Sequence, residues 1–424
     1  MNRTSCEYQK CVRILKEELL PAMGCTEPIA VAYCAAVARE TLGEMPDRVI
    51  VEASGNIIKN VKSVVVPNTG HLRGIPAAAA AGIVAGNASK QLEVISEVSE
   101  EKQKDIAEFL EKIPVKVTLA DTPLVFDIIV KTFKGENSAT VRIANYHTNI
   151  VLIEKNGKVL KSENVHAGSE EGLTDRGFLS VELILDFANS VDLKDVKELL
   201  DQQISYNMAI AEEGLRGDYG ANIGSVLLAS NEETLKLRAA AMAAAGSDAR
   251  MSGCELPVVI NSGSGNQGMT ASVPVIVYAR GINASEEKLY RALVLSNLIA
   301  IHQKTGIGRL SAYCGAINAG AAAGCGVAYL EDGSLDAISH TLVNALAIVS
   351  GVICDGAKAS CAGKIAVAVL NGFLGYEMYQ KRQQFLGGDG IVKKGVESTI
   401  KSVGRLGHDG MQQTDVEILH IMID

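Results

Sequence analysis

The sequence predicts an α+β protein with a mostly helical domain rich in Ala and Gly helices and a smaller α/β domain whose sheet is mainly antiparallel. Strand-like alternation runs through residues 46–165, and helical periodicity dominates from Ser180 onward. Glycine accounts for 41 of the 424 residues, and alanine is also abundant. Because small side chains let helices approach closely, we expect the helical part to be tightly packed.

Three segments are expected in chain order. Residues 1–45 predict two helices, interrupted at Pro21–Gly24, that pack on the catalytic domain. Residues 46–190 form the α/β domain, and residues 191–424 form the helical domain in which we expect the chemistry. A chain of this length, with 47% hydrophobic residues, can bury a large core.

The α/β segment predicts several strands and two helices. Strands are expected at residues 48–54, 61–66, 115–119, 126–133, 139–144 and 150–154, and helices at residues 75–87 and 99–113. Asn156-Gly157 is a hairpin signal, because both residues tolerate the positive φ angles of a tight turn.

In the last segment, helices are predicted at residues 193–211, 232–245, 285–304, 338–352 and 361–381. Glycine-rich linkers are expected at residues 262–268, 306–308, 324–326 and 404–410. We do not expect a long helix directly after the first of these linkers, where Pro274 interrupts the pattern.

Charge and hydropathy exclude several classes of protein. The formal net charge is −9 and no basic block occurs, so nucleic acid is not an expected partner. The N-terminus has charges throughout, unlike a signal peptide, and the apolar runs are too short or too interrupted to cross a membrane. We therefore expect a cytoplasmic protein that acts on a small molecule; a homodimer is left open.

The nine cysteines are expected to be free thiols rather than a disulfide framework. Cys6, Cys11 and Cys34 fall inside predicted helices, and Cys254 precedes an apolar stretch, so we interpret these four as structural. Cys25 instead begins a helix, where backbone N–H groups and the helix dipole favour a thiolate. The spacing alone leaves its role balanced between catalyst and core thiol.

Four further cysteines fall within 48 residues: Cys314, Cys325, Cys354 and Cys361. The pair Cys354 and Cys361 flanks a short loop that can direct two thiolates at one metal centre. The spacing matches neither a zinc ribbon nor a ferredoxin. Spacing also leaves open whether Cys314 or Cys325 completes the site.

Several polar residues are candidates for substrate contacts. The loop that contains Ser262, Ser264, Gly265, Asn266 and Gln267 can form an anion-binding nest suited to a small carboxylate; the alternative is an ordinary tight turn. A turn carries Asn145 and His147, which are either ligand contacts or structural. Further candidates are Glu27, Asn56 and Lys358, the last of which is equally compatible with a solvated loop lysine.

Four motifs together resemble the L-cysteine desulfidase family, which is related to the alpha chains of iron–sulfur L-serine dehydratases. They are Met23–Pro28, Asn261–Gly268, Ala312–Cys325 and Ile353–Cys361. The resemblance implies a cytoplasmic, PLP-independent lyase that uses a [4Fe-4S] cluster to convert L-cysteine and water to pyruvate, ammonia and sulfide. It implies Cys314, Cys354 and Cys361 as cluster ligands in residues 191–424, and Cys25 as the catalytic residue.

The sequence departs from the serine dehydratase pattern in two respects. The gap between the paired cysteines is shorter, and no cysteine follows Cys361. Three ligands would leave one iron open to the substrate's sulfur, which favours cysteine over serine as the substrate. An iron–sulfur L-serine dehydratase is the main alternative, and a non-catalytic iron–sulfur redox or amino-acid sensor is the alternative of another class.

Overall fold

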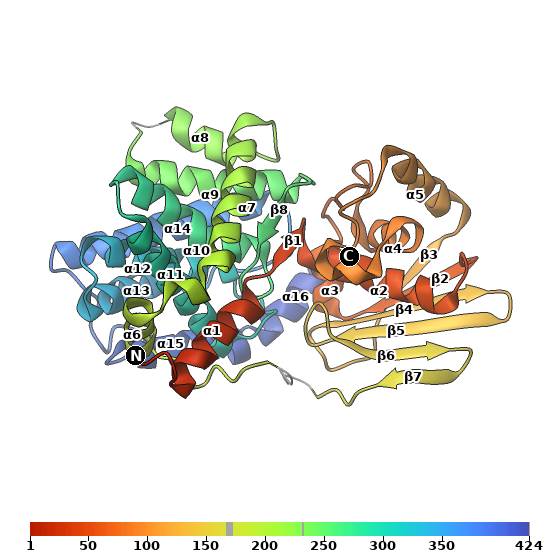
Figure 1. Cartoon of the computed structure of the whole chain (residues 1–424), viewed down its shortest axis with the longest axis horizontal. Helices are drawn as coiled ribbons and strands as arrows, with labels where there is room; N and C mark the ends of the chain where they lie inside the picture. The colour runs from red at the N-terminus through yellow and green to blue at the C-terminus, as the bar shows by residue number, and fades with distance from the viewer. Residues whose placement is uncertain (167–172, 231–232, 424) are drawn as a thin grey trace.

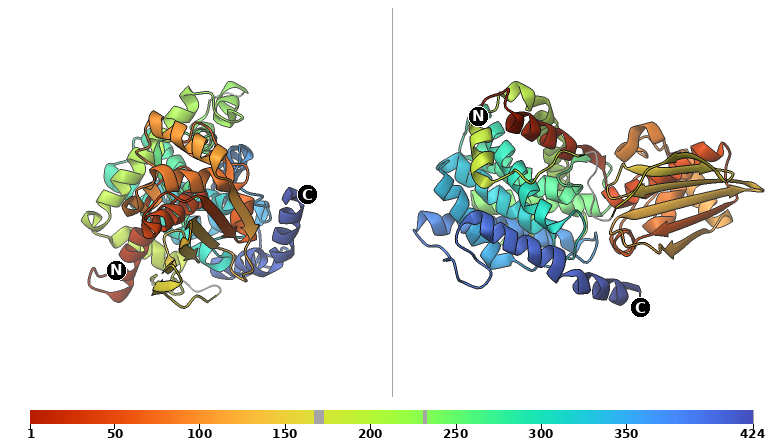
Figure 2. Two further views of the ribbon diagram at one scale, coloured as in Figure 1. Left: turned by 90° about the vertical axis from the view of Figure 1, so that its right-hand side faces the viewer. Right: turned by 90° about the horizontal axis from the view of Figure 1, so that it is seen from below.

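The computed structural model describes residues 1–166, 173–230 and 233–423. Two parts lie side by side: a bundle of helices and a smaller part built on a six-stranded sheet (Figure 1). The view from below shows the sheet and its covering helices at one end of the molecule (Figure 2, right). The predicted α+β class is therefore confirmed.

The larger sheet has the order β3-β2-β4-β5-β6-β7, and β2 and β3 are its one parallel pair among the described strands. Its strands are β2 (Arg48–Ala53), β3 (Val115–Leu119), β4 (Asp127–Lys134), β5 (Asn137–Ala144), β6 (Ile150–Lys155) and β7 (Lys158–Ser162). Asn156 and Gly157 join β6 to β7 with φ angles of 51° and 76°. Those positive angles confirm the predicted hairpin, because Asn and Gly adopt them with little strain.

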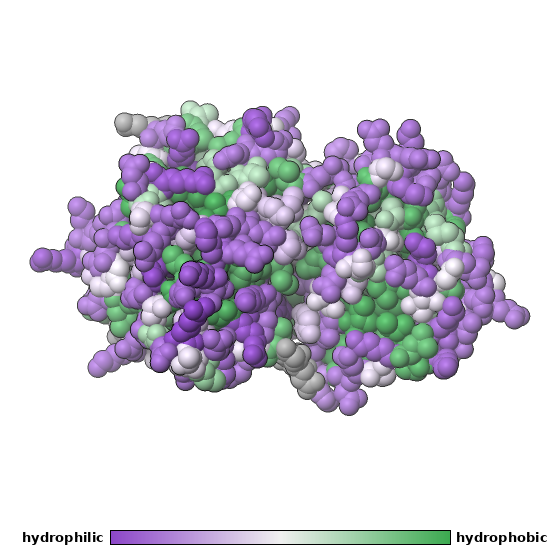
Figure 3. Space-filling view, viewed as in Figure 1, coloured by the Kyte–Doolittle hydropathy of each residue, from purple (hydrophilic) through white to green (hydrophobic). Residues whose placement is uncertain are grey.

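Helices cover one face of this sheet. Helix α2 (Thr26–Leu42) contacts β4 and β5, and α4 (Gly74–Ala85) packs on α2, with η1 (Ala88–Glu93) and α5 (Glu100–Lys112) beside them. A Cβ atom on Gly82 would lie 2.0 Å from the Ala32 carbonyl oxygen, so glycine is required for this close crossing. The opposite face carries both hydrophilic and hydrophobic side chains (Figure 3).

The first 45 residues divide between the two parts, although the sequence placed both of their helices on the helical domain. Helix α1 (Cys6–Glu18) contacts α11, but α2 lies on the sheet. The reason is burial: twelve of the 17 residues of α2 are buried, on all sides of the helix, so it needs a sheet and a helix around it.

The predicted strand at residues 61–66 is wrong. Helix α3 (Gly55–Val61) occupies its start, and the rest is irregular apart from an isolated bridge between Val65 and Arg73. The run of buried valines fills the core under α4 without a neighbouring strand, so β-branched composition alone misidentified it.

The helical part contains most of the remaining elements. They are α6 (Val181–Ser190), η2 (Leu193–Asp195), α7 (Lys197–Arg216), α8 (Ile223–Ser230), α9 (Leu235–Met251), α10 (Gly265–Gly281), α11 (Glu286–Ile307), α12 (Gly315–Glu331), α13 (Leu335–Val349), α14 (Ser360–Gln380), α15 (Val396–Arg405), η3 (Leu406–Gly410) and α16 (Gln412–Ile423). No helix in the described ranges is both long enough and apolar enough to span a membrane.

Two predicted linkers are helical. Residues 324–326 lie inside α12, where a Cβ on Gly324 would come within 2.4 Å of the Gly372 carbonyl oxygen on α14. Residues 404–410 complete α15 and form the π-helical turn η3. In α12 the glycine serves close helix packing, which a sequence pattern cannot distinguish from a flexible turn.

The segment after the glycine loop is also helical, contrary to our prediction. Helix α10 runs for 17 residues with Pro274 inside it. The helix is buried along almost its whole length, and the packing energy of that burial outweighs the proline penalty of about 3 kcal/mol.

Among the contacts that connect the two parts are a short strand pair and an ion pair. Strand β1 (Pro21–Met23) pairs antiparallel with β8 (Pro257–Val259), which precedes the glycine loop. Near the C-terminus, Asp415 on α16 forms an ion pair with the buried Lys59 of α3. The junction between the parts is thereby fixed on two sides.

Candidate functional site

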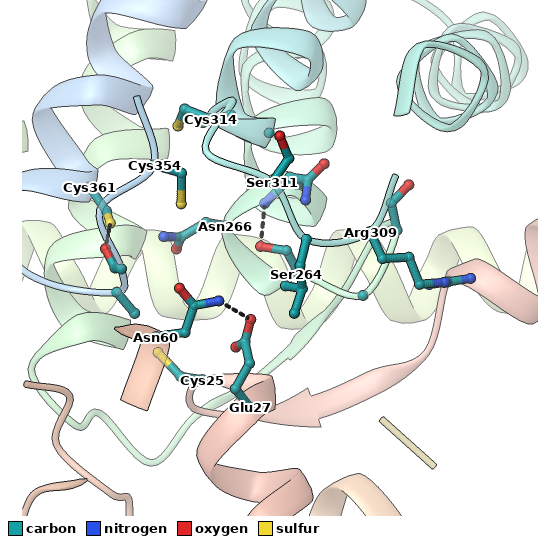
Figure 4. A pocket seen from close by; sticks show the side chains of 18 of the residues that line it. Cys25, Glu27, Asn60, Ser264, Asn266, Arg309, Ser311, Cys314, Cys354 and Cys361 are labelled. Atoms are coloured by element: carbon teal, nitrogen blue, oxygen red, sulfur yellow. Dashed lines mark hydrogen bonds between the residues drawn. The ribbon is translucent and has the colours of Figure 1, made fainter. Parts of the chain in front are cut away.

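A cavity of about 100 Å³ lies where the two parts meet (Figure 4). That is several times the volume that one water molecule needs, so a small ligand fits. The residues that line it come from both parts and from both ends of the chain: Cys25, Glu27, Asn60, His147, Arg250, Ser262, Gly263, Ser264, Asn266, Gln267, Lys304, Arg309, Leu310, Ser311, Tyr313, Cys314, Gly315, Ala316, Cys354, Gly356, Ala357, Cys361 and Ile365.

Three cysteine thiols converge on one side of this cavity. Cys314 is the N-cap of α12, Cys361 is in the first turn of α14, and Cys354 lies in the loop before α14. The two loops are joined by backbone hydrogen bonds from Cys314 N to Val352 O (3.0 Å) and from Cys354 N to Ala312 O (2.6 Å). Backbone pairing thus brings together thiols that are 40 residues apart in sequence.

Cys325 does not line the cavity. It is fully buried within α12, and its Sγ atom lies 3.6 Å from the carbonyl oxygen of Ile338 on α13. The geometry therefore favours Cys314 over Cys325 as the companion of Cys354 and Cys361.

The chemistry of the three thiols suits an iron–sulfur cluster. The described residues contain no group of three His, Cys, Asp or Glu side chains close enough to hold one metal ion. In a [4Fe-4S] cluster each thiolate binds a different iron, so the sulfur atoms need not meet at a point. All three thiols are free, and soft thiolates are the ligands that iron–sulfur clusters use.

Cys25 lies across the cavity and is 1% exposed. The predicted position is confirmed, since Cys25 is the N-cap of α2. The expected thiolate is not, because burial raises the pKa of this thiol to about 12, against the opposing effect of Arg250. Desolvation outweighs the helix dipole here, so the thiol is protonated at neutral pH in the unliganded chain.

Glu27 lines the same cavity two residues further on. Its Oε1 accepts a hydrogen bond from Asn60 Nδ2 at 3.1 Å, and the Thr26 hydroxyl lies 3.1 Å from Oε2. The Asn60 Oδ1 atom is buried and has no hydrogen-bond partner in the described part of the chain. The Glu27 carboxylate is therefore positioned by a hydrogen bond from Asn60, and the Asn60 Oδ1 atom beside it is available to accept a hydrogen bond from a ligand.

The glycine loop also lines the cavity. Ser262 and Gly263 adopt left-handed φ angles of 50° and 78°, and the Ser264 hydroxyl caps α10 by accepting from Gln267 N. Thr26 donates a hydrogen bond to the Gly263 carbonyl oxygen at 2.8 Å, which ties the loop to the Cys25 helix. Four of the five predicted loop residues line the cavity; Gly265 lies behind them.

His147 also lines the cavity, with its ring 4.7 Å from the ring of Phe126. Burial lowers its pKa to about 4, so the imidazole is neutral at physiological pH. Its Nε2 atom has no hydrogen-bond partner in the regions that the structure describes. A neutral imidazole with an unused nitrogen can contact a ligand.

Three other predicted site residues lie outside the cavity lining. Asn145 donates to the carbonyl oxygen of His166, and Asn56 belongs to α3. Lys358 pairs with Asp355 at 2.5 Å. The structure therefore does not bring these three side chains to the cavity.

The sequence analysis missed six polar lining residues: Asn60, Arg250, Lys304, Arg309, Ser311 and Tyr313. Arg250 and Lys304 are 3% and 5% exposed, although arginine and lysine are usually found at the surface. Arg309 pairs with the buried Glu18 at 2.7 Å. No local pattern separates a buried cation from a solvated one, so only the tertiary structure could identify them.

Three free thiols, a hydrogen-bonded carboxylate and a buried arginine around one small cavity describe a candidate site for a small polar molecule. A family model described as serine dehydratase alpha chain matches residues 89–420. The chain is 60% identical to a UPF0597 protein of Desulfitobacterium hafniense over 424 residues, which cover 100% of this chain and 99% of the relative.

UPF0597 proteins of Lachnoclostridium phytofermentans and Treponema denticola are 52% and 47% identical, over 98% and 100% of this chain and 100% of each relative. The chain belongs to the serine dehydratase alpha chain family. The resemblance drawn from the motifs is thus confirmed at the level of the family. Dehydratases of this kind are lyases, so the chain is a member of a lyase-type enzyme family.

Proposed function

We propose that this protein is a [4Fe-4S]-dependent L-cysteine desulfidase that converts L-cysteine and water to pyruvate, ammonia and sulfide. The observation that carries the proposal is the convergence of Cys314, Cys354 and Cys361 on one cavity that also contains Cys25. Family membership supports β-elimination from a small amino acid.

Cys314, Cys354 and Cys361 would hold the cluster, which would supply a Lewis-acidic iron with affinity for the sulfur of the substrate. Lysines surround these ligands: Lys364 forms an ion pair with Asp355 and raises the local positive potential, and Lys304 lines the cavity. Positive side chains there offset the negative charge of three thiolates.

Cys25 is our candidate for the group that accepts the α-proton. Its buried thiol must first release its own proton to water, and Arg250 is the nearby cation that favours the thiolate. The Cα–H bond then breaks with transfer of the proton to Cys25 Sγ, its electron pair forms the Cα=Cβ bond, and the C–S electron pair leaves with the sulfur as sulfide. The released aminoacrylate hydrolyses to pyruvate and ammonia.

The remaining predicted residues position the substrate. The glycine loop presents Ser264, Asn266 and Gln267 at the N-terminus of α10, where N–H groups favour anions. His147 offers a neutral ring nitrogen on the same side. Asn145, Asn56 and Lys358 would not contact the substrate directly. Each would act through the segment that carries it: the turn, helix α3 and the cluster loop, respectively.

One experiment tests the proposal. Protein purified without oxygen is assayed for iron and acid-labile sulfide, and then for sulfide and pyruvate release from L-cysteine and for pyruvate release from L-serine. We expect about four irons per chain and higher kcat/KM with L-cysteine.

Higher kcat/KM with L-serine would replace the proposal with the L-serine dehydratase reading, which the family description favours. A full cluster without turnover of either amino acid would instead support a non-catalytic sensor. Full turnover in iron-free protein would overturn the proposed requirement for the cluster.

A further inference from the structure

We propose that Arg250 and Glu27 form a clamp for the two charged groups of an α-amino acid, with Arg250 binding the carboxylate and Glu27 binding the ammonium. The inference deepens the proposed function and rests on it for the identity of the substrate. It assigns a role to a buried arginine that no local sequence pattern singled out.

The first observation is that Arg250 is a buried cation without an anion. Its side chain is 3% exposed, and its guanidinium donates one hydrogen bond, from Nη1 to Asn266 Oδ1 at 3.0 Å. Nε has no partner, and Arg250 pairs with no carboxylate, in the described residues. A buried, unpaired charge is unfavourable, and a carboxylate ligand would compensate it.

The surroundings of Arg250 are built to hold it at the cavity wall. A Cβ on Gly265 would lie 2.4 Å from Arg250 Nε, so the glycine makes room for the guanidinium. Asn266, which accepts from Nη1, also accepts from the Ser247 hydroxyl at 3.2 Å. The planar guanidinium is thereby fixed, and it suits a carboxylate better than a lysine would.

The second observation is that the cations near the site fall into two groups, one beside the cluster thiols and one beside Cys25. Lys358 and Lys364 form ion pairs with Asp355, the residue after the proposed ligand Cys354, at 2.5 and 2.6 Å. Arg250 instead opposes the effect of burial on Cys25. The lysines thus accompany the cluster thiols, and Arg250 accompanies the proposed proton acceptor.

Arg309, the other arginine of the cavity, is less suited to the role. Its guanidinium already contacts the buried Glu18 at 2.7 Å, and Arg176 reaches the same carboxylate. Its charge is therefore compensated within the protein, whereas that of Arg250 is not.

The third observation concerns Glu27, which supplies the opposite charge. Its carboxylate accepts a hydrogen bond from Asn60, and it appears with Cys25 in the same close view of the cavity (Figure 4). The buried Asn60 Oδ1 atom adds a second acceptor that lacks a donor in the described residues. An ammonium, with three donors, would satisfy both acceptors.

These charges orient the substrate. An α-amino acid carries its carboxylate and ammonium on one carbon, and the α-hydrogen leaves from that carbon. Arg250, Glu27 and Cys25 line the same small cavity, so a molecule held by both charges would have its Cα near the Cys25 sulfur. Its side chain would then extend toward Cys314, Cys354 and Cys361 on the far wall.

Calorimetric titration with two non-reacting thiols separates the two ends of the clamp. 3-Mercaptopropionate has the carboxylate but no ammonium, and cysteamine has the ammonium but no carboxylate. In the cluster-loaded protein, Arg250→Met should weaken binding of 3-mercaptopropionate by about 10- to 100-fold, the loss of one charge-assisted contact, and leave cysteamine unchanged. Glu27→Gln should do the reverse.

Arg238→Met is the matched control, because Arg238 lies on the same helix, α9, with its side chain 61% exposed. It should change neither affinity. Iron and acid-labile sulfide are counted in every variant, and Arg250→Lys keeps the charge should the methionine variant fold poorly. The lysine variant should bind 3-mercaptopropionate with intermediate affinity.

Equal weakening of both thiols in the Arg250 variants, or loss of iron from them, would assign Arg250 to the cluster and overturn the clamp. Unchanged affinities would also overturn it. If the two thiols respond oppositely but L-cysteine releases no sulfide, the clamp stands and the proposed function fails.

Discussion

The hydroxyl of Thr26 donates a hydrogen bond to the carbonyl oxygen of Gly263 at 2.8 Å, and this contact joins the helix that begins at Cys25 to the glycine loop of the helical part. Both groups are buried, and Gly263 adopts a left-handed φ of 78°. The contact connects the two parts of the molecule at the cavity.

Replacing Thr26 with valine should lower the free energy of unfolding by about 1–3 kcal/mol, because the buried carbonyl loses its donor while the shape is kept. Activity should fall further than stability explains, since the loop and Cys25 lose their connection. Urea denaturation and kcat/KM measure the two effects. A Thr26→Ser variant, which keeps the hydroxyl, should retain most of both; equal effects of valine and serine would contradict this reasoning.

Exchange of individual cysteines should separate the roles of the thiols. Cys25→Ala should keep iron and acid-labile sulfide but lose turnover by at least about 100-fold, the usual contribution of a general base. Cys314→Ala should lose iron. Cys325→Ala, which changes a buried thiol away from the cavity, should keep both iron and activity.

Metal analysis and sulfide-release assays measure these outcomes. Loss of iron in the Cys25 variant would make this thiol a ligand rather than a catalyst. Loss of iron in the Cys325 variant, at unchanged stability, would remove the preference for Cys314.

His147 should make the stability of the protein depend on pH. Burial lowers its pKa to about 4 from 6.5, with Glu27 and Glu18 opposing the shift and Arg309 and Arg250 adding to it. The unfolded chain therefore binds more protons between these values, so the free energy of unfolding falls as the pH drops from 6.5 toward 4. The full contribution is about 3 kcal/mol.

His147→Gln should flatten this part of the pH profile, measured by urea denaturation at a series of pH values. A wild-type slope in the variant would show that other groups cause the pH dependence. Above pH 6.5, any difference between the two proteins reports lost contacts rather than titration.

Gly324→Ala should destabilise the protein, because the added Cβ would lie 2.4 Å from the Gly372 carbonyl oxygen where α12 crosses α14. Overpacking of this kind costs about 1–3 kcal/mol. Gly363→Ala is the control, since no atom lies within 4 Å of the added Cβ on the same helix pair. The control should gain up to about 1 kcal/mol from helix propensity. Thermal unfolding of both variants measures the difference.

Much of the architecture could be predicted from local signals. Period-two alternation and the Asn156-Gly157 turn located the strands from β3 to β6, and long periodic segments located helices such as α5 and α11. The errors have one cause: at residues 61–66, after Gly268 and around Gly324, burial in the core overrode local preference. A sequence window carries no information about what will pack against it.

The residues of the candidate site also divide into those that local signals identified correctly and those that they did not. Cys25, Glu27 and the glycine loop were found because they occur in short motifs at element boundaries, and His147 because it lies in a polar turn. Asn145, Asn56 and Lys358 were also chosen from such features, and they lie away from the cavity lining. A local feature predicts where a polar side chain occurs along the chain, but not the direction in which the tertiary structure points it.

The sequence by itself determined the α+β class, the family, and which thiols could form one centre, because alternation, periodicity and motif spacing are properties of the chain. Only the tertiary structure decided that Cys314 rather than Cys325 accompanies Cys354 and Cys361 at the cavity, that the Cys25 thiol is protonated, and that Arg250 is buried beside it. The physical reason is desolvation. The charge state and the ligands of a side chain depend on what excludes water from it, and in this protein segments far apart in the sequence do so.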